Sequence, residues 1–469
     1  MNSINIAVID KLLILIYLIS ILLIGFLYSR NQRTNDDNFL LAGRRLSLPA
    51  FTATLVSTWY GGILGIGEFT YHYGILNWVT QALPYYLFAV LFAVFIAPKV
   101  RKSNLYTIPD QLYQHYGKPA GLIGSVFIFL LVSPASHLLM LSILFSSIFG
   151  IPFWFAVSIS ILFSTVYVFF GGFKSVVKTD IIQFILMFSG FAVLVITLFT
   201  KFGGISFLKD NLPASHLQFS GGQSAQYIVV WFFIALWTFV DPGFYQRCYA
   251  ARTPAVAQRG ILISILFWVV FDFFTTIAGL YARALFRDIP GLMAFPLLGV
   301  TILPPLLCGL FFISLMATIM STLDSNSFLA AVTFGRDIVW RIKKNVNVTH
   351  ATQFGLLITL LFSVLLLYLV PSVVKIWYLM GTLFIPSLLL PLISIFFPGI
   401  QIPKRNTVVS MIASFIGTSC WLVAGLYQST LINPSFPWDV QPFFIGLMCS
   451  VIIYLFSILK NILQREKQK

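Results

Sequence analysis

The feature that most constrains the fold of this chain is a series of long apolar segments. A helix that crosses a membrane needs about 20 apolar residues. By that measure thirteen segments qualify, near 6–28, 46–74, 76–98, 120–148, 151–170, 177–200, 225–250, 255–285, 301–334, 349–371, 373–397, 405–428 and 438–460. Only 9% of the residues are charged, whereas a soluble domain has about 25%. The sequence therefore predicts an all-α polytopic membrane protein, with residues 1–469 forming one transmembrane domain.

The net charge of +15 is explained by where the basic residues fall along the chain. Basic residues concentrate in alternate loops, as cytoplasmic loops require. This cytoplasmic set includes Arg44, Arg45, Lys174, Arg247 and Arg405. The opposite set contains only Lys11, Lys201, Lys209, Arg283, Arg287 and Lys375. The alternation predicts an N-terminus outside and a C-terminus in the cytoplasm, and it makes a nucleic-acid partner unnecessary to explain the charge.

Two of the apolar segments are interrupted. The segment 46–74 contains STWYGGILGIG, and the segment 225–250 contains WTFVDPGFYQR, where Asp241-Pro242-Gly243 must disrupt a helix. The interruptions lie five segments apart, which suggests two inverted five-helix repeats, 46–200 and 225–397, followed by two peripheral helices at 405–460. Paired broken helices indicate a binding site near the middle of the membrane.

The segment Leu310–Val339 carries more oxygen atoms than an apolar helix usually does. Thr318, Ser321, Thr322 and Ser325 fall on one face at helical spacing. Oxygen ligands at this depth are what a desolvated cation needs, so we expect a sodium site here. The alternative is that these hydroxyls bond back to carbonyl groups one turn earlier.

Several strings make the chain resemble the sodium:solute symporter family. They are DNFLLAGRRL (37–46), TIPDQLYQHYG (107–117), GGFKSVVKTDIIQ (171–183), QRCYAA (246–251), ATIMSTLDS (317–325) and RDI (336–338). The resemblance extends from about Phe39 to Ile338. It implies a LeuT-type fold with discontinuous helices, in which 6–28 is an extra helix before the ten-helix core.

The resemblance also implies a sodium site between the first broken helix and the eighth core helix. Carried over by position, the ligands are the backbone carbonyl groups of Leu55, Thr58 and Thr318 and the hydroxyl groups of Ser321 and Thr322. This set overlaps the hydroxyl residues that helical spacing places on one face of Leu310–Val339. We call these residues, Thr318, Ser321, Thr322 and Ser325, the hydroxyl band.

Asp180 lies at the start of segment 177–200, with Gln183 one turn further on. Its counterpart in the family helps sodium enter or leave, and in some members it lines a second sodium site. The alternative is a cytoplasmic-end carboxylate paired with Lys174 or Lys178.

Four other carboxylates fall within the apolar segments, where an ionisable group suggests a function. Asp241 lies in the second interruption and is expected to bind a substrate ammonium or hydroxyl group, or to cap the following half-helix. Asp324 belongs to the ATIMSTLDS motif and is expected to support the sodium helix. Glu68 is expected to face the outer vestibule, and Asp272 has no assigned role.

The candidate substrate contacts come from both broken helices and the segment 76–98. They are Ser57, Trp59, Gln81, Trp237, Thr238 and Asp241. Aromatic residues at this depth also serve as packing or as thin gates. Ser57, Gly61 and Gly62 depart from the sugar-transporting members of the family, whereas Gln81 matches a sugar-contacting position.

Together these patterns predict a sodium-coupled symporter in the plasma (inner) membrane that imports a small organic solute by alternating access. The five histidines have no metal-ligand spacing, and no phosphate-binding loop is present, so neither an enzyme nor a cofactor other than Na⁺ is expected. The alternatives are a proton-coupled carrier that titrates Asp180 or Asp241, a non-transporting sensor, and a channel.

Overall fold

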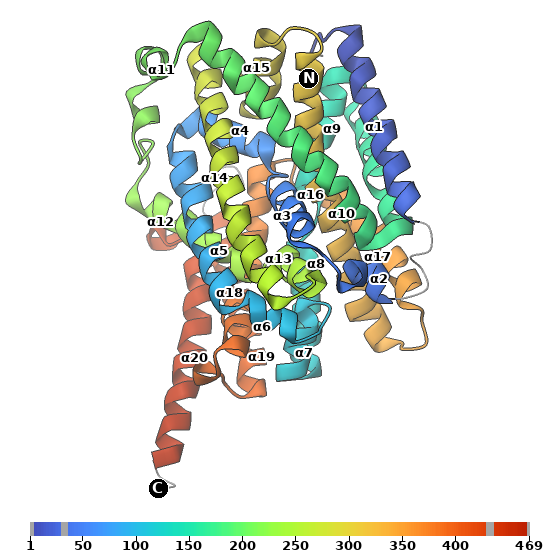
Figure 1. Cartoon of the computed structure of the whole chain (residues 1–469). Helices are drawn as coiled ribbons and strands as arrows, with labels where there is room; N and C mark the ends of the chain where they lie inside the picture. Colours follow the sequence, from blue (N-terminus) through green and yellow to red (C-terminus); the bar gives the residue numbers. More distant parts are fainter. Residues whose placement is uncertain (1–3, 30–35, 428–435, 467–469) are drawn as a thin grey trace.

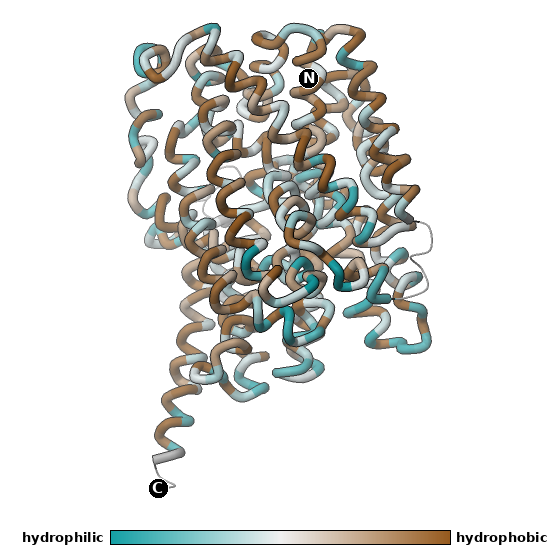
Figure 2. The backbone as a smooth tube through the Cα atoms, viewed as in Figure 1, coloured by the Kyte–Doolittle hydropathy of each residue, from teal (hydrophilic) through white to brown (hydrophobic). Residues whose placement is uncertain are grey.

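The computed structural model describes residues 4–29, 36–427 and 436–466, and within them the chain forms helices plus one isolated β-bridge between Leu46 and Ala251. The helices form an elongated bundle (Figure 1). Apolar residues cover most of the helices along its flanks (Figure 2), as a surface in contact with lipid requires. Four basic residues of the predicted cytoplasmic set, Arg30, Arg33, Lys467 and Lys469, lie outside the described residues, as does position 428 at the end of one predicted span.

The described residues contain 11 helices long and apolar enough to cross a membrane, so the predicted number of thirteen is not confirmed. Two regions account for the difference. The segment 46–74 is split into two helices that are each too short to qualify, and the segments 151–170 and 177–200 form the two halves of α10 (Phe153–Phe202), which join at a kink between them.

Helix α10 changes direction at Gly172, which has φ 59° and ψ −153°. A Cβ atom at this position would lie 2.4 Å from the carbonyl oxygen of Phe39. Glycine therefore suits both the backbone conformation and the close approach of the preceding chain. The kink lies in the GGFKSVVKTDIIQ motif and orients the half of α10 that carries Asp180.

Both predicted helix interruptions are present. The first broken helix consists of α3 (Leu48–Trp59) and α4 (Ile63–Tyr73), joined by Tyr60-Gly61-Gly62. The second consists of α12 (Ala225–Ile234), the 3₁₀ helix η4 (Ala235–Phe239) and α13 (Pro242–Ala250). Proline at the first turn of α3 and α13 fits a helix start, where no intrahelical N–H bond is lost.

Helix α16 (Leu307–Val332) lies inside the bundle. Nearly every residue of it is buried, and it packs against α1 (Val8–Ser29), α3, α9 (Ala135–Phe149), α10 and α17 (Val348–Leu369). A helix buried on all sides has no need of an apolar stripe, which explains how hydroxyl groups can occupy one of its faces.

The remaining helices surround these elements. The longer ones are α5 (Leu83–Phe95), α8 (Lys118–Leu131), α14 (Pro254–Leu285), α18 (Val373–Phe396), α19 (Lys404–Tyr427) and α20 (Pro442–Glu466). The shorter ones are α2 (Asp36–Leu41), α6 (Ala97–Lys102), α7 (Ile108–Tyr116), α11 (Ile205–Asn211) and α15 (Ala294–Ile302).

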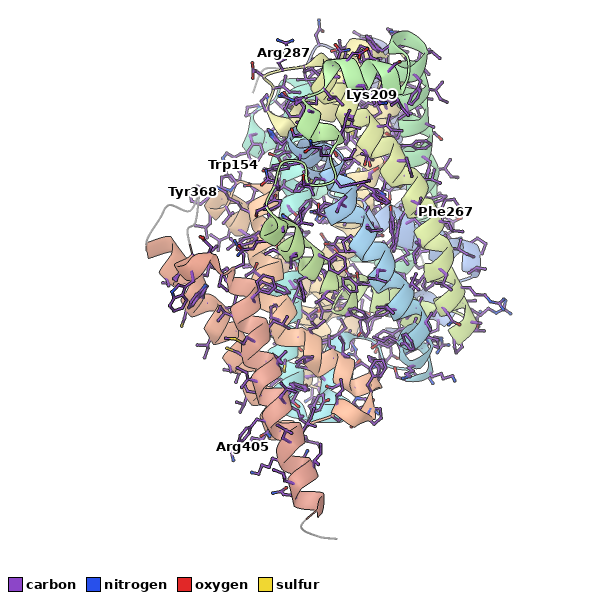
Figure 3. All side chains as sticks on the ribbon, turned by 90° about the vertical axis from the view of Figure 1, so that its left-hand side faces the viewer. Trp154, Lys209, Phe267, Arg287, Tyr368 and Arg405 are labelled. Carbon is purple, nitrogen blue, oxygen red and sulfur yellow. The ribbon has the colours of Figure 1, made fainter. Side chains whose placement is uncertain are left out.

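The labelled basic residues lie where the topology argument expects them. Lys209 and Arg287 lie at one end of the bundle and Arg405 at the other (Figure 3), and α1 begins at the first of these ends whereas α20 ends at the second (Figure 1). Which end faces the cytoplasm stays a prediction. One assignment is wrong: Arg247 is fully buried within the bundle and is not a loop residue, because it lies on the half-helix α13.

Candidate ion and substrate site

The predicted sodium ligands lie together where the end of α3 meets the middle of α16. The Thr322 hydroxyl donates a hydrogen bond to the Thr58 carbonyl oxygen at 2.7 Å. The Ser321 hydroxyl lies 2.9 Å from the Ser57 hydroxyl. The two helices are therefore joined by the atoms that the sequence selected as ligands, although these residues are about 260 positions apart in the chain.

Bonding back along the helix accounts for only part of the hydroxyl band. The Thr318 hydroxyl donates to the Ser314 carbonyl oxygen at 2.7 Å. The atom of Thr318 that can bind an ion is therefore its backbone carbonyl oxygen. The Thr322 hydroxyl reaches the Thr318 carbonyl only at 3.5 Å, farther than the Thr58 carbonyl. Ser321 and Thr322 thus point across to α3.

Asp180 is fully buried beside these residues. Its carboxylate accepts hydrogen bonds from Thr54 and, at 2.7 Å, from Ser321. Its ionic partner is Arg247, with Nη2 3.7 Å from Oδ2, and not Lys174 or Lys178. The single Ser321 proton can be donated to this carboxylate or to the Ser57 hydroxyl, and in either case the oxygen keeps a lone pair that can face a cation.

Arg247 was missed as a site residue because the sequence analysis counted it among the cytoplasmic loop charges. Its guanidinium group donates to the hydroxyl groups of Thr58 and Ser325, both at 2.8 Å, and of Thr54 at 3.2 Å. Its position inside the segment 225–250, which is long enough to span the membrane, was the available signal. An intramembrane arginine requires a buried partner, and Asp180 is that partner.

Asp324 joins α16 to α10. Its carboxylate accepts hydrogen bonds from the Ser164 hydroxyl and the Tyr167 hydroxyl, both on α10. These bonds satisfy a buried polar group and hold α16 in place, which is the supporting role that the sequence analysis expected for Asp324.

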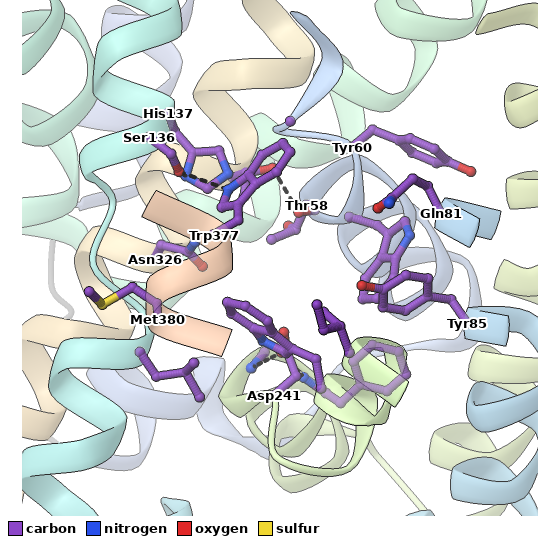
Figure 4. Close-up of a pocket in the computed structure, with 18 of the residues that line it drawn as sticks. Thr58, Tyr60, Gln81, Tyr85, Ser136, His137, Asp241, Asn326, Trp377 and Met380 are labelled. Carbon is purple, nitrogen blue, oxygen red and sulfur yellow. Dashed lines mark hydrogen bonds between the residues drawn. The ribbon is translucent and has the colours of Figure 1, made fainter. Parts of the chain in front are cut away.

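A cavity of about 190 Å³ opens beside the α3–α16 contact. Four of the predicted substrate residues line it, namely Trp59, Gln81, Trp237 and Asp241, and it also borders Leu55, Thr58 and Thr322. Figure 4 shows Thr58, Gln81 and Asp241 around this space. The predicted ion site and the predicted substrate site therefore adjoin.

Two predicted substrate residues do not line this cavity. Ser57 is buried on the ion side, next to Ser321. Thr238 is buried and donates to the carbonyl oxygen of Ala235 at 3.0 Å. Glu68 is also absent from the lining and lies close to Gly291, at the top of the first broken helix.

Several lining residues were not predicted, among them Asp272, His137, Asn326 and Trp377. Asp272 accepts a hydrogen bond from the Tyr86 hydroxyl, and the Trp377 indole donates to the Ser136 hydroxyl at 3.0 Å. No sequence motif marks these residues, since their elements meet only in the folded bundle.

Asp241 caps the second half-helix. Its Oδ1 accepts hydrogen bonds from the backbone N–H groups of Gly243 at 2.6 Å and Phe244 at 3.2 Å, which satisfies two N–H groups that a helix start leaves unpaired. Of the two roles considered from the sequence, capping is observed. The carboxylate still borders the cavity, so a second role toward a solute remains compatible with it.

Trp59 is held rigidly at the cavity wall. Its ring stacks on Trp268 with centroids 5.0 Å apart, and it meets Tyr85 and Phe244 edge-on at 5.1 and 5.6 Å. Packed aromatic rings offer fixed faces that attract cations.

Gly61 keeps the break in α3/α4 close to α16, and this closeness gives a test. A Cβ atom at Gly61 would lie 2.2 Å from Cβ of Thr322, so Gly61→Ala must displace Thr322. We expect the sodium concentration for half-maximal stabilisation to rise about tenfold, because overpacking at such a site costs about 1–3 kcal/mol. Sodium titrations of melting temperature measure this.

Gly399→Ala is the matched control for this substitution, because no heavy atom lies within 4 Å of the added carbon. An unchanged sodium requirement in well-folded Gly61→Ala would show that Thr322 does not bind the ion.

Comparison with known proteins identifies similar sequences over most of the chain. Residues 39–417 match the family model described as the sodium:solute symporter family. The sodium/pantothenate symporter of Escherichia coli is 27% identical over 359 residues, covering 72% of this chain and 74% of that protein. The osmoregulated proline transporter OpuE of Bacillus subtilis is 23% identical, with coverage of 96% and 98%.

Two solved structures share the fold. A Na⁺-coupled sialic acid symporter in a substrate-bound outward-open state superposes with a TM-score of 0.83 over 98% of each chain, at 19% identity. Mhp1 in an inward-facing conformation gives a TM-score of 0.54 at 12% identity, covering 93% of this chain and 95% of that one. The all-helical bundle with two broken helices therefore has the LeuT-type fold.

Proposed function

Because the chain belongs to the sodium:solute symporter family, we propose that it imports one small organic solute by coupling that import to the inward movement of Na⁺. The observation that carries this proposal is the hydrogen bond between Thr322 on α16 and the Thr58 carbonyl group on α3. It brings hydroxyl and carbonyl oxygens from two separate elements to one buried point, directly beside a cavity.

The proposed ion ligands are the carbonyl oxygens of Leu55, Thr58 and Thr318 and the hydroxyl oxygens of Ser321 and Thr322. Carbonyl groups released at a helix break and hydroxyl groups on a facing helix are suited to a desolvated monovalent cation. Asp180, hydrogen-bonded to Ser321, orients one of these ligands and adds negative charge next to the ion.

Coupling follows from the position of the ion between two elements. Sodium bound there holds α3 against α16 and shapes the adjoining cavity, so it raises the affinity for the solute. The inward sodium gradient and about 2.3 kcal/mol per charge for each 100 mV of membrane potential drive the import. Loss of the ion to the cytoplasm loosens the α3–α16 contact and allows the bundle to open inward.

We further propose that the solute carries an ammonium group. The N-terminus of a half-helix attracts an anion, but here Asp241 already supplies the negative charge at the start of α13. No basic residue among the described ones lies within 4 Å of its carboxylate. A carboxylate in a cavity wall that also contains Trp59 and Trp237 suits an ammonium group by charge and by cation–π attraction.

Gln81 is the proposed partner of a second group on the solute. Its Nε2 atom is buried and has no hydrogen-bond partner within the described ranges, and the residue lines the cavity. A buried donor without a partner is costly, so a carbonyl, hydroxyl or carboxylate oxygen of the solute would satisfy it. Pantothenate and proline appear in the names of two relatives. These names describe those proteins and do not identify the solute of this chain.

Asp241→Asn tests the ammonium proposal. Asparagine caps a helix as well as aspartate does, so α13 keeps its start while the charge is lost. We expect the apparent affinity for the solute to fall about 100-fold, the scale for truncating a buried charge pair. The exposed acid Asp288 provides the control Asp288→Asn, and an unchanged affinity in Asp241→Asn would refute recognition through this carboxylate.

The coupling ion and the solute are tested together by thermal stability of the purified protein. We expect Na⁺ but not K⁺ to raise the melting temperature, and a solute with an ammonium group to raise it further only when Na⁺ is present. A protein stabilised equally by both salts, with solute binding that instead follows pH, would support the proton-coupled alternative.

The proposed location is the plasma membrane, with the N-terminus outside.

A further inference from the structure

The first helix of the chain, α1, contacts the start of α16 through a buried carboxylate. Asp10 is 1% exposed, and its Oδ1 atom accepts hydrogen bonds from the backbone N–H groups of Leu306 at 2.8 Å and Gly309 at 3.0 Å. These N–H groups belong to the N-cap and N3 positions of α16, which a capping box pairs with side chains of the same helix. Here one carboxylate oxygen from another helix accepts both bonds.

The start of α16 depends on this contact because its own N-cap residue cannot replace it. Leu306 has no side-chain oxygen that could accept a hydrogen bond from the N3 position. Its backbone has φ 73° and ψ −49°, close to the γ-turn with positive φ, which is rare and strained. Such a conformation persists only where the surrounding structure holds it, and Asp10 binds the N–H group of this residue.

Gly309 allows α1 to approach this closely. A Cβ atom on Gly309 would lie 2.9 Å from Oδ1 and 3.1 Å from Cα of Asp10. A residue with a side chain would therefore push the carboxylate away from the start of α16, and the glycine fits the contact as much as the aspartate does.

Helix α1 reaches α16 again at the depth of the proposed ion ligands. The buried Tyr17 hydroxyl donates to Sδ of Met320, the residue before Ser321, at 3.9 Å. It also accepts a hydrogen bond from Nε2 of Gln183 on α10 at 3.4 Å, and Gln183 lies one turn from Asp180. Tyr17 therefore joins α1 to both helices that carry side chains of the ion site.

A third point of contact lies further along α1. A Cβ atom on Gly25 would lie 2.5 Å from Cγ of Tyr167, and the Tyr167 hydroxyl donates to the Asp324 carboxylate on α16. Helix α1 thus touches the start of α16 directly, its middle directly, and its later part through Tyr167. Contacts spread along a helix fix both its axial position and its rotation.

We propose that α1 positions the sodium ligands of α16, with Asp10 as the main positioning residue, so that sodium affinity depends on a helix that supplies no ligand. The inference rests on the proposed function, because Ser321 and Thr322 are the ligands that α1 positions. At a rise of 1.5 Å per residue, Thr322 lies about 20 Å along α16 from Gly309. A helix transmits a shift at its start along its length, and such a shift separates Thr322 from the Thr58 carbonyl oxygen, 2.7 Å away.

The test is equilibrium binding of ²²Na⁺ to the purified full chain, which needs no knowledge of the solute. We expect Asp10→Ala to raise the sodium concentration for half-maximal binding about tenfold, because both hydrogen bonds to the start of α16 are lost. Asp10→Asn keeps an oxygen acceptor, and asparagine caps a helix as well as aspartate does, so its sodium affinity should match the wild type.

Asn347→Ala is the matched control, because it removes the cap of a helix outside the proposed site. The Asn347 side chain accepts a hydrogen bond from the His350 N–H group at the start of α17. Helix α17 carries no proposed ligand, and none of its described residues lines the cavity. We expect its melting temperature to fall and its sodium affinity to stay unchanged, as would also be seen for Asp10→Ala if Asp10 only stabilised the fold.

Gly309→Ala is a second test that applies even if Asp10→Ala is not recovered as folded protein. Alanine favours a helix more than glycine does, but its Cβ atom must displace the Asp10 carboxylate. We therefore expect a similar rise of about tenfold in the sodium requirement.

Wild-type sodium affinity in folded Asp10→Ala or in folded Gly309→Ala would overturn the proposal. So would an equal loss of affinity in Asn347→Ala, because the effect would then not depend on α16. A wild type that binds no sodium would instead refute the proposed function, so the two failures are distinguishable.

Discussion

Replacing both hydroxyl ligands, Ser321→Ala with Thr322→Ala, raises the sodium concentration needed for half-maximal stabilisation about 100-fold. Each hydroxyl that contacts a charged group contributes about 1.5 kcal/mol or more, and two such losses correspond to about two decades of affinity. The loss is expected to be specific to the ion, because alanine is tolerated well in a helix. The variant should insert into membranes and purify as the wild type does.

The measurement is a sodium titration of melting temperature, repeated with ²²Na⁺ binding. The matched control is Ser264→Ala with Thr359→Ala. These hydroxyls are also buried, but each bonds only to a carbonyl oxygen four residues earlier in its own helix. A sodium requirement that is the same in the site variant, the control and the wild type would remove α16 from the ion site.

Asp180→Asn is expected to have the second large effect, on both folding and sodium binding. Asp180 is the ionic partner of the fully buried Arg247, and leaving a buried charge without its partner costs about 3–5 kcal/mol. The amide that replaces the carboxylate also lacks the charge that Ser321 faces. We expect a much lower yield of folded protein and no stabilisation by sodium at concentrations that saturate the wild type.

Size-exclusion profiles and melting curves in detergent measure this result, with the exposed Asp288→Asn as control. Adding Arg247→Gln to Asp180→Asn removes the unpaired charge and should restore the folded yield without restoring tight sodium binding. If Asp180→Asn alone folds and responds to sodium as the wild type does, Asp180 is neither the necessary partner of Arg247 nor part of the ion site.

The sequence predicted the features that depend on local chemistry. Asp241-Pro242-Gly243 interrupts a helix because proline and an N-capping aspartate act on their immediate neighbours. The hydroxyl groups of Ser321 and Thr322 fall on one face because helical spacing fixes their direction. The family resemblance gave Asp180 a role on the ion path, and in the structure its carboxylate accepts a hydrogen bond from Ser321.

The features that were missed depend on contacts between distant elements. Arg247 looked like one more cytoplasmic charge, and only the packing of α13 against α3 and α16 shows that it faces Thr58 and Ser325. The boundary predicted between the spans 151–170 and 177–200 is present as the kink at Gly172, but the sequence did not show that the two halves join end to end as α10. Asp272 acquired a place in the cavity wall only when Tyr86 and α14 came together.

The most direct test of the central claim is uptake into proteoliposomes that contain the purified protein, with the ammonium-bearing solute that stabilises it best in the presence of Na⁺. An inward sodium gradient should drive the solute above its external concentration, and collapse of that gradient at fixed pH should abolish the accumulation. Accumulation that persists without sodium, or that follows an imposed pH gradient instead, would contradict the account.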